Sequence, residues 1–322
     1  MGAVRGGLSG GTAVWRTAAR GVWIVAKADI AALLALGAAF FIAVGDVIQQ
    51  RSAHKVTAAR VGLVELFTGL LKDPRWWLGS VAGFVGFGLQ AAALGHGSVV
   101  LVEPLLVTSL LFALPMSARA NGRQVSFAQW GRAALLAVAV AVVVLVGKPT
   151  AGHSRGALEV WTGVVAVLGP GLVLCIAGAR MLAGRPAAAV LLGLVSGALW
   201  GVFAVLTKGV VERLGHGIET LLSSPELYGW AVVAVAATAF QQSSFRAGSL
   251  AASLPSMTVA EPVVASVLGI LVLGETLRPG KDGWVLLIAA IAVMVVSTVA
   301  LARSVAGAGT ITGAAPSRRA GG

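Results

Sequence analysis

Charged residues are scarce in this sequence. Of the 322 residues, 11% are charged and 57% are hydrophobic, whereas soluble globular domains carry about 25% charged residues. The chain therefore lacks the polar residues that would cover a water-soluble globule of this size. This composition disfavours a soluble enzyme, a nucleic-acid-binding protein and a secreted disulfide scaffold, and it predicts a polytopic membrane protein.

Cysteine and known catalytic motifs are also nearly absent. Cys175 is the only cysteine, which excludes an intramolecular disulfide and a cysteine-based zinc or iron–sulfur site. The sequence contains no HExxH motif, no P-loop and no GxGxxG motif after a strand. We therefore expect no enzymatic activity, no catalytic residue and no cofactor, and we leave metal binding open.

Positive charge exceeds negative charge, with a formal net charge of +12. In a soluble chain this excess would suggest nucleic acid, but the basic residues here fall mainly in the tails and between apolar blocks. That distribution is typical of loops at an anionic membrane surface. We predict a multi-pass protein of the cytoplasmic (plasma) membrane. Its expected partner is the lipid bilayer, and we expect it to bind no nucleic acid. Loop charges favour an external N-terminus and the basic N-terminal tail favours the opposite, so the orientation stays open.

Long apolar runs fill most of the chain. A helix needs about 20 apolar residues, each rising 1.5 Å, to cross a bilayer. Period-2 alternation is absent, which favours helices over a barrel. We predict an all-α integral membrane protein with nine transmembrane helices, or ten if a mixed stretch also spans. The nine segments are 30–50, 76–95, 98–118, 130–147, 157–179, 187–207, 227–245, 249–274 and 283–303.

Polar or mixed stretches flank these segments. Residues 1–28 form a basic, Gly-rich tail without the features of a cleaved signal peptide. The tail at 304–322 is small, polar and predicted to be disordered. The stretches 56–72 and 210–222 mix charges with leucine and predict interfacial amphipathic helices.

The chain also shows self-similarity at long spacing. At an offset of 158 residues, Glu103-Pro104 matches Glu261-Pro262. At an offset of 151 residues, Gln90 matches Gln241. Matching Glu-Pro dipeptides are unexpected by chance in helices that contain so few charges, so these matches indicate two structural repeats.

The repeats predict the domain organisation. The first transmembrane repeat covers 29–147, a connecting helix lies in 148–186, and the second repeat covers 187–303. Because one extra helix lies between the two copies, an odd number of spans precedes the second copy, which therefore has the opposite orientation in the membrane. Inverted repeats with a binding site at their interface, built around interrupted helices, are common in secondary transporters.

Three acidic residues lie more than two positions inside predicted spans, where ionisable groups are costly and functional by default. They are Asp46, Glu103 and Glu261. Glu261 precedes Pro262, which frees a backbone carbonyl about one turn earlier. A carboxylate beside free carbonyl groups can bind a cation, or take up and release a proton.

Structural roles are the alternative for each acidic residue. Glu261 would be neutral or paired with Lys208 or Arg246, and Asp46 would be neutralised by Arg51 near the headgroups. Glu103 would lie near the interface, since its helix begins about five residues earlier. Lys208 ends its predicted span and is expected to snorkel toward water.

Amide and aromatic side chains complete the predicted site. Gln90, Gln241 and its neighbour Gln242 can donate and accept hydrogen bonds, which suits solute recognition. Their alternative is hydrogen bonding between helices, and Trp200 either lines a cavity or packs. The candidates for helix breaks or hinges are Pro104, Pro170, Pro255 and Pro262.

Glycine is abundant, with 43 residues. Small residues let transmembrane helices approach closely when they recur every fourth position. Gly79-x-x-x-Gly83 and Gly193-x-x-x-Gly197 follow this pattern and predict two helix contacts.

The second half resembles a known transporter repeat. The run Glu261–Ala265, then Gly269, Gly274-Glu275 and Gly283 at the start of the last helix, is similar to the end of an EamA-type half. That half is the repeat unit of the drug/metabolite transporter superfamily. The resemblance implies a membrane protein that moves a small solute, and members of the superfamily usually have ten helices.

The first half is similar to one branch of that superfamily, the NIPA-like magnesium transporters. Trp76-Trp77-x-Gly79, and Gln90 followed fourteen residues later by Pro104, carry this similarity. The nine-helix count also suits the branch. Glu103 stands where the branch typically has threonine, and Ser117 stands where the paired half has Glu275. Because of these two differences, the resemblance does not predict which substrate the protein carries.

Three functions follow from these observations. The first is a secondary transporter of a small solute that works by alternating access, either with or without coupling to protons. The second is a transporter of magnesium or another divalent cation, and the third is a non-transporting membrane scaffold. A homodimer is compatible with each of them.

Overall fold

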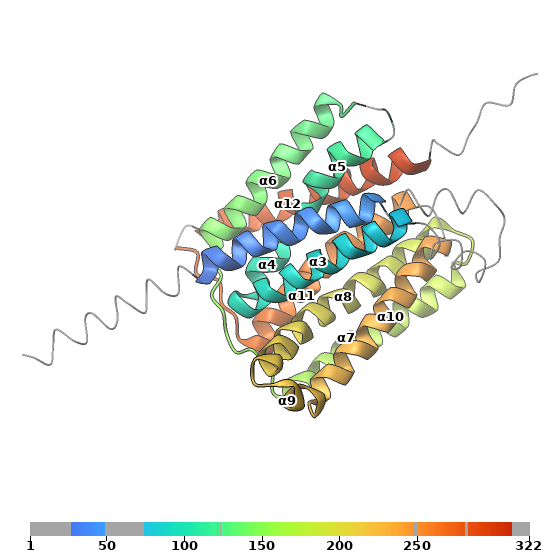
Figure 1. Cartoon of the computed structure of the whole chain (residues 1–322). Helices are drawn as coiled ribbons and strands as arrows, with labels where there is room; N and C mark the ends of the chain where they lie inside the picture. Colours follow the sequence, from blue (N-terminus) through green and yellow to red (C-terminus); the bar gives the residue numbers. More distant parts are fainter. Residues whose placement is uncertain are drawn as a thin grey trace, which may run out of the picture.

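The fold is a bundle of helices whose axes run roughly side by side (Figure 1). The computed structural model describes residues 27–48, 74–120, 122, 124–247, 250–280 and 283–310. The helices are Lys27–Ile48, α3 (Pro74–His96), α4 (Val99–Leu106), α5 (Ser109–Ala120), α6 (Phe127–Gly147), α7 (Leu158–Met181), α8 (Pro186–Gly215), α9 (Ile218–Leu222), α10 (Pro225–Ala247), α11 (Leu250–Leu273) and α12 (Gly283–Thr310). In the described part of the chain the only extended pairing is one β-bridge, Thr150–Thr276.

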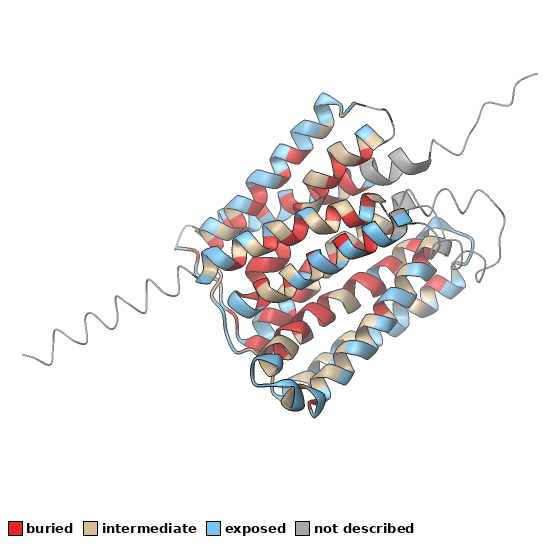
Figure 2. Ribbon diagram, viewed as in Figure 1, coloured by how far each residue is buried: buried red, intermediate tan, exposed pale blue. Residues whose placement is uncertain are grey.

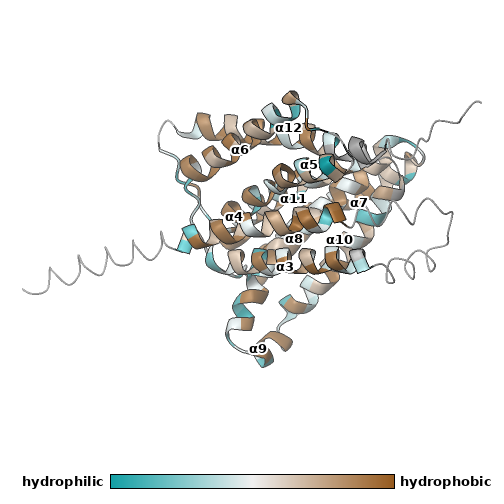
Figure 3. Ribbon diagram, turned by 45° about the horizontal axis from the view of Figure 1, so that its top comes forward, coloured by the Kyte–Doolittle hydropathy of each residue, from teal (hydrophilic) through white to brown (hydrophobic). Residues whose placement is uncertain are grey.

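The predicted spans coincide with these helices. Eight spans in the described residues are long and apolar enough to cross a membrane, with α4 and α5 forming one of them together. The ninth predicted segment, 227–245, lies on α10, which is 23 residues long but more polar. Apolar residues cover most of the helix bodies (Figure 3), so the all-α, multi-pass membrane class is confirmed.

The centre of the bundle is formed by α4, α8 and α11. The span that contains α4 is 72% buried and that of α8 is 61% buried, whereas α7 has no buried residue in its most apolar window. Figure 2 shows the same contrast between buried α4 and α8 and exposed α7. Apolar side chains on α7 that contact no protein face lipid in a membrane.

Glycines set the closest helix contacts, as the two predicted motifs indicated. Gly193 and Gly197 of α8 face the backbone of α11, and Gly201 continues the row one turn later. On the helix Lys27–Ile48, a Cβ atom at Gly45 would lie 2.9 Å from the carbonyl oxygen of Gly79 and 3.0 Å from the amide nitrogen of Gly83. Both predicted glycine contacts are confirmed.

One span is interrupted in its middle. The helix stops at Leu106 and resumes at Ser109, two to five residues after Pro104. Pro104 cannot donate to the carbonyl of Val100, which weakens the turn before the break. The hinge predicted at Pro104 therefore lies next to a real interruption.

The other three prolines do not break their helices. Pro170 lies within α7, and Pro255 and Pro262 lie within α11, and both helices run through them. A complete helix break at these prolines is wrong, because the rest of the hydrogen-bond ladder keeps a membrane helix intact around one missing donor. Their role as hinges or kinks stays a prediction.

Two predicted boundaries also differ. The stretch 210–222 is divided between the last turns of α8, which runs to Gly215, and the short α9. The C-terminal helix continues to Thr310, past the end predicted at 303. The amphipathic stretch predicted at 56–72 and the N-terminal tail to residue 26 lie outside the described residues.

Candidate functional site

Two predicted residues meet where α3 packs on α4. Glu103 lies four residues after the start of α4 and is 1% exposed, so protein surrounds its carboxyl group. Its closeness to the membrane interface stays a prediction. The Nε2 group of Gln90 on α3 donates a hydrogen bond to Glu103 Oε1 at 3.3 Å. This is a single amide contact for a buried carboxyl group, whose oxygens can accept up to four hydrogen bonds.

The other two acidic residues extend this arrangement across helices. Glu261 on α11 lies within electrostatic range of Glu103, and Asp46 lies within electrostatic range of Glu261. Glu261 is half-buried and Asp46 is exposed near the end of its helix. The predicted acidic candidates thus lie on three helices, α4, α11 and Lys27–Ile48, and influence one another only in sequence: Asp46 with Glu261, and Glu261 with Glu103.

No basic side chain that the structure describes pairs with these carboxyl groups. The side chain of Arg246, the other predicted partner of Glu261, is not among them. The two ion pairs among the described side chains are Arg155–Glu226 and Lys208–Glu275. The predicted alternative in which Lys208 pairs with Glu261 is therefore wrong. Arg51, the alternative partner of Asp46, lies outside the described residues.

A second predicted pair lies between α8 and α10. Trp200 Nε1 donates a hydrogen bond to Gln241 Oε1 at 3.2 Å. The indole ring of Trp200 also meets Phe203 edge-on, with ring centroids 5.0 Å apart, and Phe203 stacks on Trp230. Gln242 is exposed on α10 and belongs to neither pair.

Sequence reasoning missed a buried charge that has three hydrogen-bond partners. Glu275, just after α11, is 1% exposed. Its Oε1 accepts from the backbone N–H of Val99 at 2.8 Å and from Lys208 Nζ at 2.6 Å, and its Oε2 accepts from the N–H of Val100 at 2.9 Å. Lys208 does not snorkel, because α8 continues past it and the side chain is only 6% exposed.

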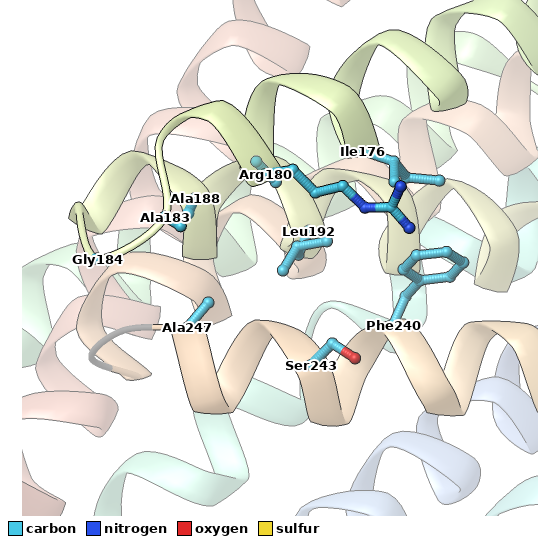
Figure 4. A pocket seen from close by; sticks show the side chains of 10 residues that line it. Ile176, Arg180, Ala183, Gly184, Ala188, Leu192, Phe240, Ser243 and Ala247 are labelled. Atoms are coloured by element: carbon cyan, nitrogen blue, oxygen red, sulfur yellow. The ribbon is translucent and has the colours of Figure 1, made fainter.

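A cavity lies elsewhere in the bundle. A groove of about 390 Å³ opens between α7, α8 and α10, near the turn that joins α7 to α8. Figure 4 shows Arg180 reaching along it toward Ile176 and Phe240. Its lining is mostly apolar and includes none of the predicted acidic or amide residues. A smaller cavity of about 180 Å³ is lined by Lys208 and Glu212, among others.

Metal ligands do not cluster in the described residues. No group of three or more histidine, cysteine, aspartate or glutamate side chains there is close enough to hold a metal ion. The acidic residues form a spaced series across the bundle.

The fold defines an all-α, multi-pass membrane protein, and its central helices α4 and α11 carry the acidic side chains Glu103 and Glu261. The chain is 39% identical over 279 residues to an uncharacterized protein of Corynebacterium glutamicum, covering 85% of this chain and 95% of that protein. The chain belongs to the family of that protein.

A partial similarity points to transport. Over 81 residues the chain is 32% identical to a probable magnesium transporter, NIPA1, of Arabidopsis thaliana, covering 25% of this chain and 24% of that protein. No family model matches the chain, and no solved structure matches it. The similarity and the membrane fold support a membrane transporter in general terms.

Proposed function

We propose that the protein is a secondary transporter of a small solute, working by alternating access in the plasma membrane and coupled to protons or to a cation. The observation that carries the proposal is the placement of Glu103 and Glu261 on touching helices, without a basic partner among the side chains that the structure describes. Two carboxyl groups that repel each other in a low-dielectric interior take up positive charge, as protons or as a cation. The proposal includes no enzymatic activity and no cofactor.

The repeat adds support. Glu103 and Glu261 are the two members of the matched Glu-Pro dipeptides, and α4, which carries the first, packs on α11, which carries the second. Inverted repeats place substrate and coupling-ion sites at the interface between the copies, on discontinuous helices. The break between α4 and α5 is such a discontinuity. These features favour the drug/metabolite transporter superfamily as the wider family.

Polar side chains supply a second surface for the solute. Gln90 holds Glu103, and the Trp200–Gln241 pair lies on α8 and α10 beside aromatic rings. An aromatic wall with a few amide groups is typical of a small-molecule site.

A magnesium transporter is the second candidate. It is favoured by the similarity to a probable magnesium transporter over a quarter of the chain. A hard divalent cation prefers oxygen ligands and often keeps several of its waters. The carboxyl series Asp46, Glu261 and Glu103 offers oxygens for a partly hydrated ion.

The test is a flux measurement on the reconstituted protein. Liposomes loaded with pH-sensitive and Mg²⁺-sensitive dyes receive imposed gradients of each ion, with wild type, Glu261→Gln and Glu103→Gln compared. Glu226→Gln is the matched control, because Glu226 is a glutamate paired with Arg155 at the edge of the bundle. The control should keep wild-type flux.

The outcomes separate the candidates. Mg²⁺ entry that both substitutions abolish supports the cation transporter. Proton movement that appears only with an added solute and is lost in Glu261→Gln supports the proton-coupled carrier. If both substitutions keep wild-type flux for every solute and ion that the wild type moves, the carboxyl pair has no transport role. No flux from the wild type in a broad solute screen would favour the non-transporting scaffold.

A further inference from the structure

One end of the bundle is closed by contacts between loops. This end, named the α9 face, holds α9 and the loops at 148–157 and 274–280 (Figure 1). The two loops are joined by the Thr150–Thr276 bridge, in which the two Oγ1 atoms lie 2.6 Å apart. His153 N–H also donates to the carbonyl of Leu273 at 2.6 Å. The loops therefore form one cover over this face.

Glu275 fastens this cover to the central helices. Its carboxylate accepts from the first two N–H groups of α4 and from the ammonium of Lys208 on α8. The third N–H of α4, that of Leu101, donates to the hydroxyl of Ser98 at 3.1 Å. Helix N-termini leave their first N–H groups without partners inside the helix. The first turn of α4 is therefore completed by a side chain from a part of the chain about 175 residues away.

Separating the cover from α4 would uncover buried charge. Glu275 and Lys208 are both more than nine-tenths buried and satisfy one another. Breaking a buried pair is strongly unfavourable unless water or another charge replaces the lost partner. The small cavity beside Lys208 is lined also by Glu212 and Leu94. Water in this cavity could take the place of Glu275 as the partner of Lys208.

We infer that Glu275 is the latch of a gate at the α9 face, and that the structure shows the state in which this face is closed. The Glu275 carboxylate holds the start of α4 against the cover, and the face opens when the bonds to Val99, Val100 and Lys208 break. Glu275 is a positioning residue, because it acts on the helix that carries Glu103 and does not touch the solute. The inference rests on the proposed transport function for its purpose, but the closed latch can be tested without any flux.

The test measures the reactivity of a cysteine at the latch. In a Cys175→Ala background, Val99→Cys replaces a side chain that is 0% exposed and leaves its backbone N–H intact. A water-soluble maleimide is added to the protein in nanodiscs, where both faces are accessible. Glu275→Gln should raise the labelling rate of Val99→Cys by about tenfold or more, because it removes a charged acceptor from α4 and Lys208. Tenfold corresponds to about 1.4 kcal/mol.

Two controls separate opening from unfolding. Glu226→Gln breaks the ion pair between Arg155 of the cover and α10, and it should leave the labelling rate unchanged because this pair does not contact α4. A second reporter, Val143→Cys, is buried against Leu287 between α6 and α12 and should stay unreactive in Glu275→Gln. If both reporters become reactive, Glu275→Gln has unfolded the protein, and the labelling is repeated with Glu275→Asp. Aspartate keeps the negative charge but is too short to reach both backbone N–H groups of α4.

Equal labelling of Val99→Cys in the Glu275 variants and in Glu226→Gln would overturn the inference. The flux assay is independent of this result. Faster labelling of Val99→Cys in Glu275→Gln, together with no flux from the wild type, would support the latch and reject the proposed transport. Flux from the wild type, together with an unchanged labelling rate, would support transport and reject the latch.

Discussion

A methyl group added at Gly201 tests the central helix contact. The Cβ atom of Gly201→Ala would lie 2.8 Å from the carbonyl oxygen of Glu261 and 2.8 Å from the amide nitrogen of Ala265, both on α11. Ordinary contacts of a Cβ atom begin at 3.4 Å, so α8 and α11 must separate by 0.6 Å at this point. The atoms in contact belong to the backbone, so no flexible side chain can move aside.

The magnitude follows from two opposing effects. Overpacking of a well-packed contact destabilises a protein by about 1–3 kcal/mol. Alanine stabilises a helix relative to glycine by up to about 1 kcal/mol. Gly163→Ala on α7 has only the second effect, since nothing lies within 4 Å of its new Cβ atom. The two variants should therefore differ in free energy of unfolding by about 1–3 kcal/mol, with Gly201→Ala the less stable.

The assay is equilibrium unfolding in mixed detergent micelles, followed by tryptophan fluorescence. Flux is measured on the same variants, because the imposed separation lies at the backbone of Glu261. Gly201→Ala should lose flux while Gly163→Ala keeps it. Equal unfolding free energies for the two variants would refute the reasoning, since they would show that α8 and α11 do not touch at Gly201 in the membrane protein.

Three further predictions concern other contacts. Trp200→Phe keeps an aromatic ring beside Phe203 but loses the hydrogen bond to Gln241, and it should lower the free energy of unfolding by about 0.6 kcal/mol, the average for such bonds in membrane bundles. Gly45→Ala should destabilise the protein by about 1–3 kcal/mol in the same unfolding assay, because its Cβ atom would press on the backbone of Gly79 and Gly83. Arg155→Ala should destabilise it by less than about 1 kcal/mol, as expected for an exposed ion pair, and high salt should remove the difference. Partial burial raises the pKa of Glu226, but the hydrogen bonds and charge of Arg155 lower it overall below the ordinary 4.5. The stabilisation by Arg155 is therefore present above pH 4.5 and disappears as the pH falls through the lowered pKa, which unfolding curves at several pH values would measure.

Hydropathy made the helices predictable, but not their interruptions. A run of about 20 apolar residues has few folded forms in a bilayer other than a helix, so segment positions follow from composition. Whether a proline breaks the helix depends on what surrounds it. The helix stops just after Pro104, where Thr108 N–H instead donates to the carbonyl of Leu105 in a tighter turn. The helix continues through Pro262, although the Glu-Pro dipeptide is the same.

The candidate site was predictable residue by residue, but its partnerships were not. Polar residues in apolar segments are visible in the sequence, so Glu103, Gln90 and Gln241 could be singled out. The bond between Trp200 and Gln241 joins residues 41 positions apart, which spacing alone does not reveal. Glu275 falls one residue after the segment that was predicted to end at 274. Its partners on α4 are main-chain N–H groups, which carry no side-chain signal.

The distribution of charge separates two roles for acidic residues in the interior. Glu275 has Lys208 and two backbone N–H groups, so its negative charge is balanced within the protein and suits a structural latch. Glu103 has one amide from Gln90, and Glu261 has no ion-pair partner among the described residues. A buried carboxylate that the protein itself does not balance must be balanced by a proton or by a cation from solution. Under the proposed function, we expect the exchange of that positive charge at Glu103, on the helix that Glu275 bonds to, to be linked to the opening of the α9 face.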